Sequence, residues 1–123
     1  MLRLFFAAVV GISIFAGSAC ADDSAWGALA LDTEKAERAP FYGVGGGATE
    51  EEAVANAINF CNEAGGKTCK SLVTYEQCGA LAVSGSGDAG WGKAPTKITA
   101  EAQAIAGCAN DNCKIVASDC NAE

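Results

Sequence analysis

The sequence predicts a small α+β domain in which two pseudo-symmetric strand-strand-helix-strand repeats pack together and are stapled by disulfides. Three observations support this. A short unit is written twice along the chain, hydrophobic residues recur with strand and helix periods within each unit, and six cysteines remain once an apolar leader is removed. The chain has 123 residues, which is the size of one domain and its leader.

The N-terminus has the three parts of a secretory signal. Arg3 gives a positive start, Leu4–Ala16 is an apolar run, and Ala19–Ala21 supplies small residues for cleavage. The apolar run is shorter than the roughly 18 to 20 residues that cross a bilayer. We therefore predict a signal peptide over residues 1–21 and a single mature domain over residues 22–123, secreted or periplasmic.

An alternative is a lipid anchor at Cys20, because Ser18 and Ala19 suit a lipoprotein cleavage box. Gly17 replaces the usual leucine of that box, so simple secretion is favoured. Both routes leave the same six thiols, those of Cys61, Cys69, Cys78, Cys108, Cys113 and Cys120.

The internal repeat divides the mature chain into about 26–78 and about 79–120. The offset between matching blocks shrinks along the chain, and each shortening falls between blocks, where loops tolerate deletion. Two copies are too few for an open solenoid, so a closed pair is expected. The matching blocks are Gly27–Leu31 with Gly79–Val83, Tyr42 and Gly43 with Trp91 and Gly92, Thr49–Cys61 with Thr96–Cys108, Cys69–Val73 with Cys113–Ala117, and Cys78 with Cys120.

The first part of each unit reads as two strands. Gly27–Leu31 alternates large and small residues, which suits a strand that a neighbouring backbone approaches on one face. Asp32–Pro40 is charged and ends in proline, so it reads as a loop that leads into a short strand, Phe41–Val44.

A helix follows in each unit, and a strand closes it. Thr49 and Glu52 form a capping box, and an alanine-rich stripe then recurs at helical spacing up to the cysteine. Gly65 and Gly66 end the first helix, and Gly107 lies near the end of the second. The closing strands are expected at Lys70–Tyr75 and Lys114–Ser118.

Six cysteines in a short exported chain imply three disulfides and no free thiol. Sequence alone permits fifteen pairings. The repeat favours two local bridges, Cys61 with Cys69 and Cys108 with Cys113, and a third, Cys78 with Cys120, between equivalent positions of the two units. Zinc is disfavoured because the chain has no histidine and no C-x-x-C spacing, so no metal ligand is predicted.

The charge excludes several kinds of partner. The chain carries 15 acidic and 8 basic residues, a net charge of −7 that becomes −8 when Arg3 leaves with the signal. Such a domain repels phosphate backbones, so nucleic-acid binding is not expected, and a cationic protein is the natural electrostatic partner. The oligomeric state is not indicated by the sequence.

Two motifs near the first helix invite a sharper interpretation. Gly43–Ala48 formally matches the dinucleotide fingerprint, but a pyrophosphate there would face the three acids of Glu50–Glu52. We predict a glycine-rich turn that leads into the helix cap, and no cofactor. Consecutive acids on a helix also lack the spaced oxygens of a calcium loop, so they are interpreted as a complement to the helix dipole.

No catalytic residue is predicted. The commonest general base is absent, and acids that could act in pairs show no pairing in their spacing. Trp91 stands where the first repeat has Tyr42, which favours a packing role, whereas Trp26 precedes the first strand and is a candidate for a partly exposed contact. The candidate acids are Asp88, Glu101, Asp22, Asp23 and Asp32.

The order of these blocks resembles a known family. The run WGALAL, then YG, an alanine-rich helix ending in cysteine, C-K-x-x-V, CGALAV, WG, a second alanine-rich helix and a last cysteine are similar to bacterial exported proteins of domain-of-unknown-function family 4189. The resemblance covers about Trp26 to Cys120 and implies a duplicated, disulfide-bearing envelope or secreted module. The family brings no established reaction or site residue. Asp32–Pro40 is more charged than the corresponding family segment.

Two functional hypotheses follow. The first is a non-catalytic binding module with an acidic surface, one version of which is an inhibitor of a basic secreted enzyme such as lysozyme. The second is a small hydrolase that uses carboxylates.

Overall fold

The computed structural model describes residues 25–34 and 40–121. The predicted signal peptide, Cys20 and the centre of the charged loop lie outside these residues. No helix in the described ranges is long and apolar enough to span a membrane.

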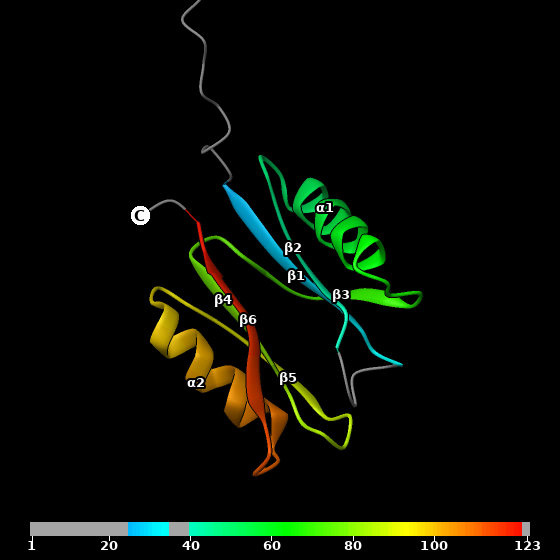
Figure 1. Ribbon diagram of the computed structural model, residues 1–123. Helices are drawn as coiled ribbons and strands as arrows, with labels where there is room; N and C mark the ends of the chain where they lie inside the picture. Colours follow the sequence, from blue (N-terminus) through cyan, green and yellow to red (C-terminus); the bar gives the residue numbers. More distant parts are fainter. Residues whose placement is uncertain (1–24, 35–39, 122–123) are drawn as a thin grey trace, which may run out of the picture.

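The fold consists of two similar units, each with a three-stranded antiparallel sheet and one helix (Figure 1). This confirms the predicted α+β class with two repeats. The strand orders are β2-β1-β3 and β5-β4-β6, so the first strand of each unit is central. The first unit comprises β1 (Trp26–Asp32), β2 (Tyr42–Gly47), α1 (Glu50–Glu63) and β3 (Cys69–Tyr75); the second comprises β4 (Cys78–Val83), β5 (Ala89–Ala94), α2 (Lys97–Cys108) and β6 (Lys114–Cys120).

The two sheets face each other, and each helix covers the outer face of its own sheet, so the layers run α1, sheet, sheet, α2 (Figure 1). Large and small residues of the central strands are sorted between the two faces. Leu29 and Leu31 of β1 meet Leu81 and Val83 of β4 in the core between the sheets. The intervening alanines turn outward and pack against the helices.

The helices lie unusually close to the sheets because glycines face them from the second strand of each unit. A Cβ at Gly45 would overlap the backbone of Ala53 and Ala57 in α1, and a Cβ at Gly92 would overlap the backbone of Ala100 in α2. Small residues thus form both sides of each helix-sheet contact. The neighbouring backbone that the alternating pattern of β1 implied is that of α1.

The strand register corrects two expectations about the first hairpin. β2 runs to Gly47, so the glycine-rich segment is a strand and not the expected turn. Leu29 pairs with Val44, and its counterpart Leu81 pairs with Trp91. Trp91 therefore corresponds to Val44, and the alignment of Trp91 with Tyr42 was wrong by two residues. The second unit is shorter than the first between its first strand and its helix, and this whole difference lies in the loop between the first two strands.

α1 begins after the predicted cap Thr49, and α2 begins after Thr96, its counterpart in the repeat. The hydroxyl of Thr49 accepts the N–H of Glu52 at 3.2 Å, and that of Thr96 accepts the N–H of Thr99 at 3.3 Å. Each bond satisfies one of the free donors of a first helical turn. At the other end, α2 finishes with Ala109 in the left-handed region, at φ 53°, where glycine is usual.

The outer edge of each sheet is covered at one equivalent position. In the first unit the side-chain amide of Asn56 donates to the carbonyl of Gly46 at 2.8 Å. In the second, the side-chain oxygen of Gln103 accepts the N–H of Lys93 at 3.1 Å. Both helices therefore bond to a free backbone group of the strand at the edge.

The structure contains three disulfides, Cys61 with Cys69, Cys78 with Cys120 and Cys108 with Cys113. The first and last join the end of each helix to the segment that begins its closing strand. Cys78 and Cys120 are register partners on β4 and β6, with their Cα atoms 4.0 Å apart. Both belong to the second unit, so the interpretation of this bridge as a link between the two units was wrong.

Substitution of the glycines under the helices tests the close approach. We expect Gly45→Ala to lower the free energy of unfolding by about 1–3 kcal/mol, because the new Cβ must push α1 away from the sheet. Gly85→Ala is the matched control, since no heavy atom lies within 4 Å of a Cβ there. Urea unfolding measures both, and equal effects would contradict the packing argument.

The bridges differ in the length of chain that they close. Replacing Cys78 and Cys120 by alanine should lower the free energy of unfolding by about 4 kcal/mol in the loop-entropy model, against about 2 kcal/mol for Cys108 and Cys113. Peptide mapping without reduction should first recover the three pairs. A peptide joining Cys61 to Cys108 would reject this pairing.

Candidate functional site

The buried carboxylate of Asp32 ends β1 and holds the two loops beside it. It accepts the N–H of Glu34 at 3.0 Å, the N–H of Lys67 at 3.1 Å and the hydroxyl of Thr68. The bond from Thr68, with the backbone N–H groups, lowers the pKa of Asp32 to about 2 against the opposing effect of burial. This candidate acid is fully engaged in the fold.

Asp88 has a similar structural part in the second unit. Ser84, which occupies the position of Asp32, accepts the N–H groups of Ser86 and Asp88 with its hydroxyl. The carboxylate of Asp88 accepts the side-chain amide of Asn110 at 2.9 Å, which ties the β4–β5 turn to the loop after α2.

The structure brings none of the other candidate acids into a catalytic pair. The half-buried Glu101 accepts the hydroxyl of Ser118 at 3.5 Å, on the outer side of β6. Asp22 and Asp23 lie outside the described residues. Within residues 25–34 and 40–121 no group of three or more His, Cys, Asp or Glu side chains could hold a metal ion.

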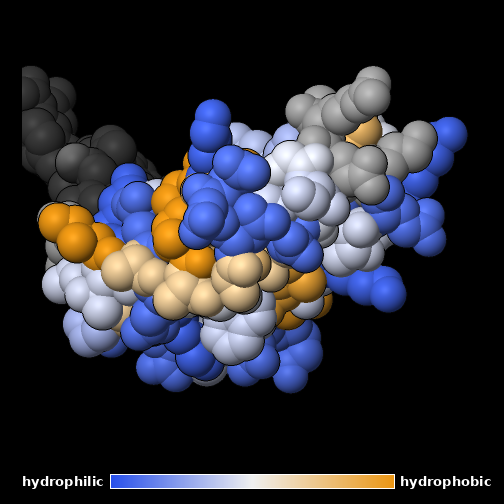
Figure 2. All heavy atoms as spheres, turned by 90° about the horizontal axis from the view of Figure 1, so that it is seen from below, coloured by the Kyte–Doolittle hydropathy of each residue, from blue (hydrophilic) through white to orange (hydrophobic). Residues whose placement is uncertain are grey.

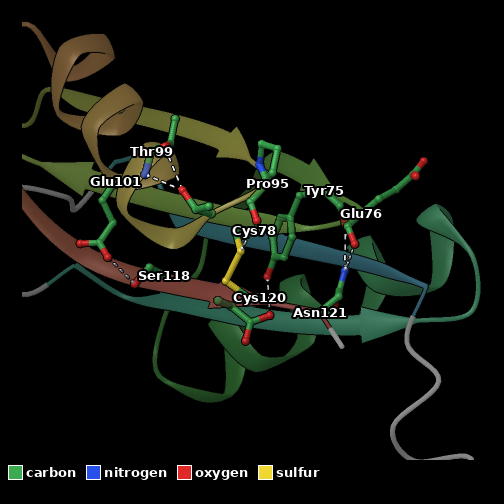
Figure 3. The surroundings of a disulfide bond; sticks show 11 residues. Tyr75, Glu76, Cys78, Pro95, Thr99, Glu101, Ser118, Cys120 and Asn121 are labelled. Carbon is green, nitrogen blue, oxygen red and sulfur yellow. Dashed lines mark hydrogen bonds between the residues drawn. A yellow bond between two sulfur atoms is a disulfide. The ribbon is translucent and has the colours of Figure 1, made fainter. Parts of the chain in front are cut away.

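A hydrogen-bonded pair that the sequence did not single out lies between the two units. The hydroxyl of Tyr75 on β3 donates to Asp119 on β6 at 2.7 Å (Figure 3). The ring is buried, and a Cβ on either Gly27 or Gly79 would overlap it. Burial and the bond to Asp119 raise the pKa of Tyr75 well above its usual range.

Two hollows flank the Cys78–Cys120 bridge near this pair. The larger, about 450 Å³, lies between the bridge and the start of α2 and is lined by Gln77, Pro95 and Asn121 among others. The smaller, about 290 Å³, lies between Trp26 and Lys93. Asn121 is already engaged, since its amide donates to the carbonyls of Tyr75 and Glu76 (Figure 3).

One of the two tryptophans departs from the sequence interpretation. Trp91, expected to pack, is 49 % exposed on the edge strand β5. Trp26 is partly exposed, as expected, and its buried part packs against the cluster between β1 and α1. The two units differ at this position, because Val44, the register counterpart of Trp91, packs against the core between the sheets.

Three consecutive acids lie on the surface at the first turn of α1. Glu50, Glu51 and Glu52 are all exposed there, and the helix dipole favours negative charge at this end. Glu50 accepts the hydroxyl of Thr74 on β3 at 3.3 Å. The glycine run before this turn packs against α1, so it forms no loop around a phosphate.

A comparison with protein-family models supports the family resemblance that the sequence motifs indicated. The model described as "Domain of unknown function (DUF4189)" matches residues 26–120. The chain belongs to the DUF4189 family. No curated protein and no solved structure matches the chain.

The sequence motifs by which this DUF4189 domain resembles its family have structural roles. The GALA runs form the central strands, and the glycines of the WG block and its counterpart lie under the helices. Tyr75 and Asp119 could have been found from the repeat, because they hold equivalent places: Tyr75 pairs with Gly27, and Asp119 with Gly79.

Because Asp32 anchors two loops through its carboxylate, the stability of the fold should depend on pH. The folded pKa of about 2 lies below the unfolded value near 3.9, so this carboxylate stabilises the fold above about pH 4 and its contribution is lost between about pH 4 and 2. Asp32→Asn should be less stable than the natural protein at pH 6 and should lose less stability in that window.

Urea midpoints measured from pH 2 to 6 test this expectation. Asp111→Asn, a substitution at an exposed aspartate, is the control and should keep the natural stability at pH 6. An Asp32→Asn protein whose midpoint equals the natural one at pH 6 would contradict the anchoring part of Asp32.

Proposed function

We propose that this DUF4189 domain is an exported, non-catalytic binding module whose acidic surface takes a cationic protein. The observation that carries the proposal is the exposed turn Glu50–Glu52 at the start of α1. Acidic patches steer basic partners and raise their rate of association. The overall charge of −7 adds to this attraction.

Export is part of the proposal. Disulfides persist in oxidising compartments and are rare in the cytosol, and this domain holds three in about a hundred residues. The predicted signal peptide over residues 1–21 agrees with a secreted or periplasmic location.

The groups that could take part in catalysis are engaged in structural contacts, which supports a non-catalytic function. The six cysteines are bridged, and Asp32, Ser84 and Asp88 are held in hydrogen bonds that shape loops. Among the described residues every buried polar side-chain atom has a partner. Such a framework leaves recognition to its surface.

Inhibition of a basic enzyme such as lysozyme is the specific version of this function. A carboxylate-dependent hydrolase is the competing hypothesis, and it requires Asp88 or Glu101 to act on substrate although both accept bonds from neighbouring side chains.

Lysozyme serves as the cationic probe. We expect binding that weakens steeply with added salt, and the triple substitution of Glu50, Glu51 and Glu52 by glutamine should lower the affinity about tenfold. The control removes the same charge elsewhere, through glutamine or asparagine at Glu63, Glu76 and Asp111, three exposed acids outside that turn. Calorimetry at low salt measures the affinities.

Equal losses in the two triple variants would show that only net charge matters and would contradict a site on α1. A bound lysozyme with reduced activity would support the inhibitor version. Hydrolysis of glycan or peptide substrates that Asp88→Asn or Glu101→Gln abolishes would replace the proposal by the hydrolase.

A further inference from the structure

The outer side of α2 presents apolar residues to solvent. Ile98 is 82 % exposed and Ile105 is 38 % exposed. They lie on one side of the helix with three exposed alanines at spacings of three and four residues. Figure 2, a view onto the α2 side, shows a band of apolar surface between hydrophilic residues. We call this set the α2 stripe: Ile98, Ala102, Ile105, Ala106 and Ala109.

The fold itself does not require this stripe, as the duplicated unit demonstrates. α1 packs on its sheet through the same alanine and cysteine positions as α2. Yet where α2 has Ile98, α1 has Glu51, and where α2 has Ala106 and Ala109, α1 has Asn59 and Asn62. The inner faces of the helices agree. On the outer faces Ala102 and Ile105 have the same residues in α1, Ala55 and Ile58, but the other three positions are polar there, so only α2 presents an unbroken apolar stripe.

The charges at the ends of α2 oppose its own dipole. Lys97 stands in the first turn, where the dipole favours an acid and where α1 has Glu50. Asp111 follows the C-terminal end, where a base is favoured. Each charge would be stabilised by a helix that runs past α2 in the opposite direction.

We infer that the α2 stripe binds the α2 stripe of a second copy of this chain, with the two helices antiparallel. In one register Ile98 of one protomer lies against Ala109 of its partner, and Ala102 against Ile105, so each large residue meets a small one. The same register brings Lys97 beside Asp111 of the partner. Because the arrangement is two-fold, every contact is made twice.

The distribution of charge favours the same pairing. Residues 26–77 carry eight acidic and four basic side chains, whereas residues 78–121 carry four acidic and three basic. A dimer through α2 joins the nearly neutral halves and keeps the acidic halves apart, which limits repulsion between copies. A helix of 12 residues is about 18 Å long, so the contact is small and the dimer dissociates on dilution.

Sedimentation of the mature, disulfide-bonded protein between about 10 µM and 1 mM tests this. The mass should rise toward twice that of the monomer, and Ile98→Glu, which introduces the residue of α1, should raise the midpoint concentration at least about tenfold. Phe60→Glu is the control, since Phe60 is 53 % exposed on α1 and its loss should leave the midpoint unchanged.

A charge exchange separates pairing from folding. Lys97→Glu should keep or raise the stability of the monomer, because an acid suits the first turn, and yet weaken the dimer severalfold. Adding Asp111→Lys should restore part of the lost affinity, since the ion pair is then reversed in both protomers while the helix dipoles are unchanged.

The inference is overturned by a protein that stays monomeric throughout, by association that Ile98→Glu leaves intact, or by a double variant that does not recover. Binding of lysozyme is measured at low micromolar concentration, so its failure and the failure of the dimer are independent.

Discussion

The close approach of each helix to its own sheet is the constraint on which the rest of the structure depends. It is possible only where both surfaces lack bulk, so alanines face glycines across the contact. The large residues of the central strands must then point the other way, and they become the core between the two sheets. One steric requirement thus fixes which face of every strand is buried against which layer.

Much of this packing could be predicted from the sequence because it depends on residues that recur at short, regular spacings. The alternation of Gly27–Leu31, the threonine caps and the helical stripes are local signals, and they predicted the elements and the repeat. The register of the edge strands was not predictable in this way. Tyr42 and Trp91 are both aromatic residues followed by glycine. Only their strands' pairing with β1 and β4 shows that they occupy register positions two residues apart.

The candidate site was less predictable, because its residues are defined by contacts across the chain. Asp32 looked like a free acid near a tryptophan, whereas Lys67 and Thr68 bury it in hydrogen bonds. The repeat in the sequence aligned Cys78 with Cys120. In the structure, however, the residue of the first sheet equivalent to Cys78 is Trp26. The two units share their helix-packing faces and differ at many of the remaining positions.

The side-chain amides of Asn56 and Gln103 protect two strand edges against pairing with another chain. An open strand edge invites another β-strand to add to it, and repeated addition leads to fibrils. By occupying a backbone group at the same place on β2 and β5, each helix interrupts that template. Addition of a strand from another molecule is thereby discouraged at the β2 edge of the first sheet and at the β5 edge of the second.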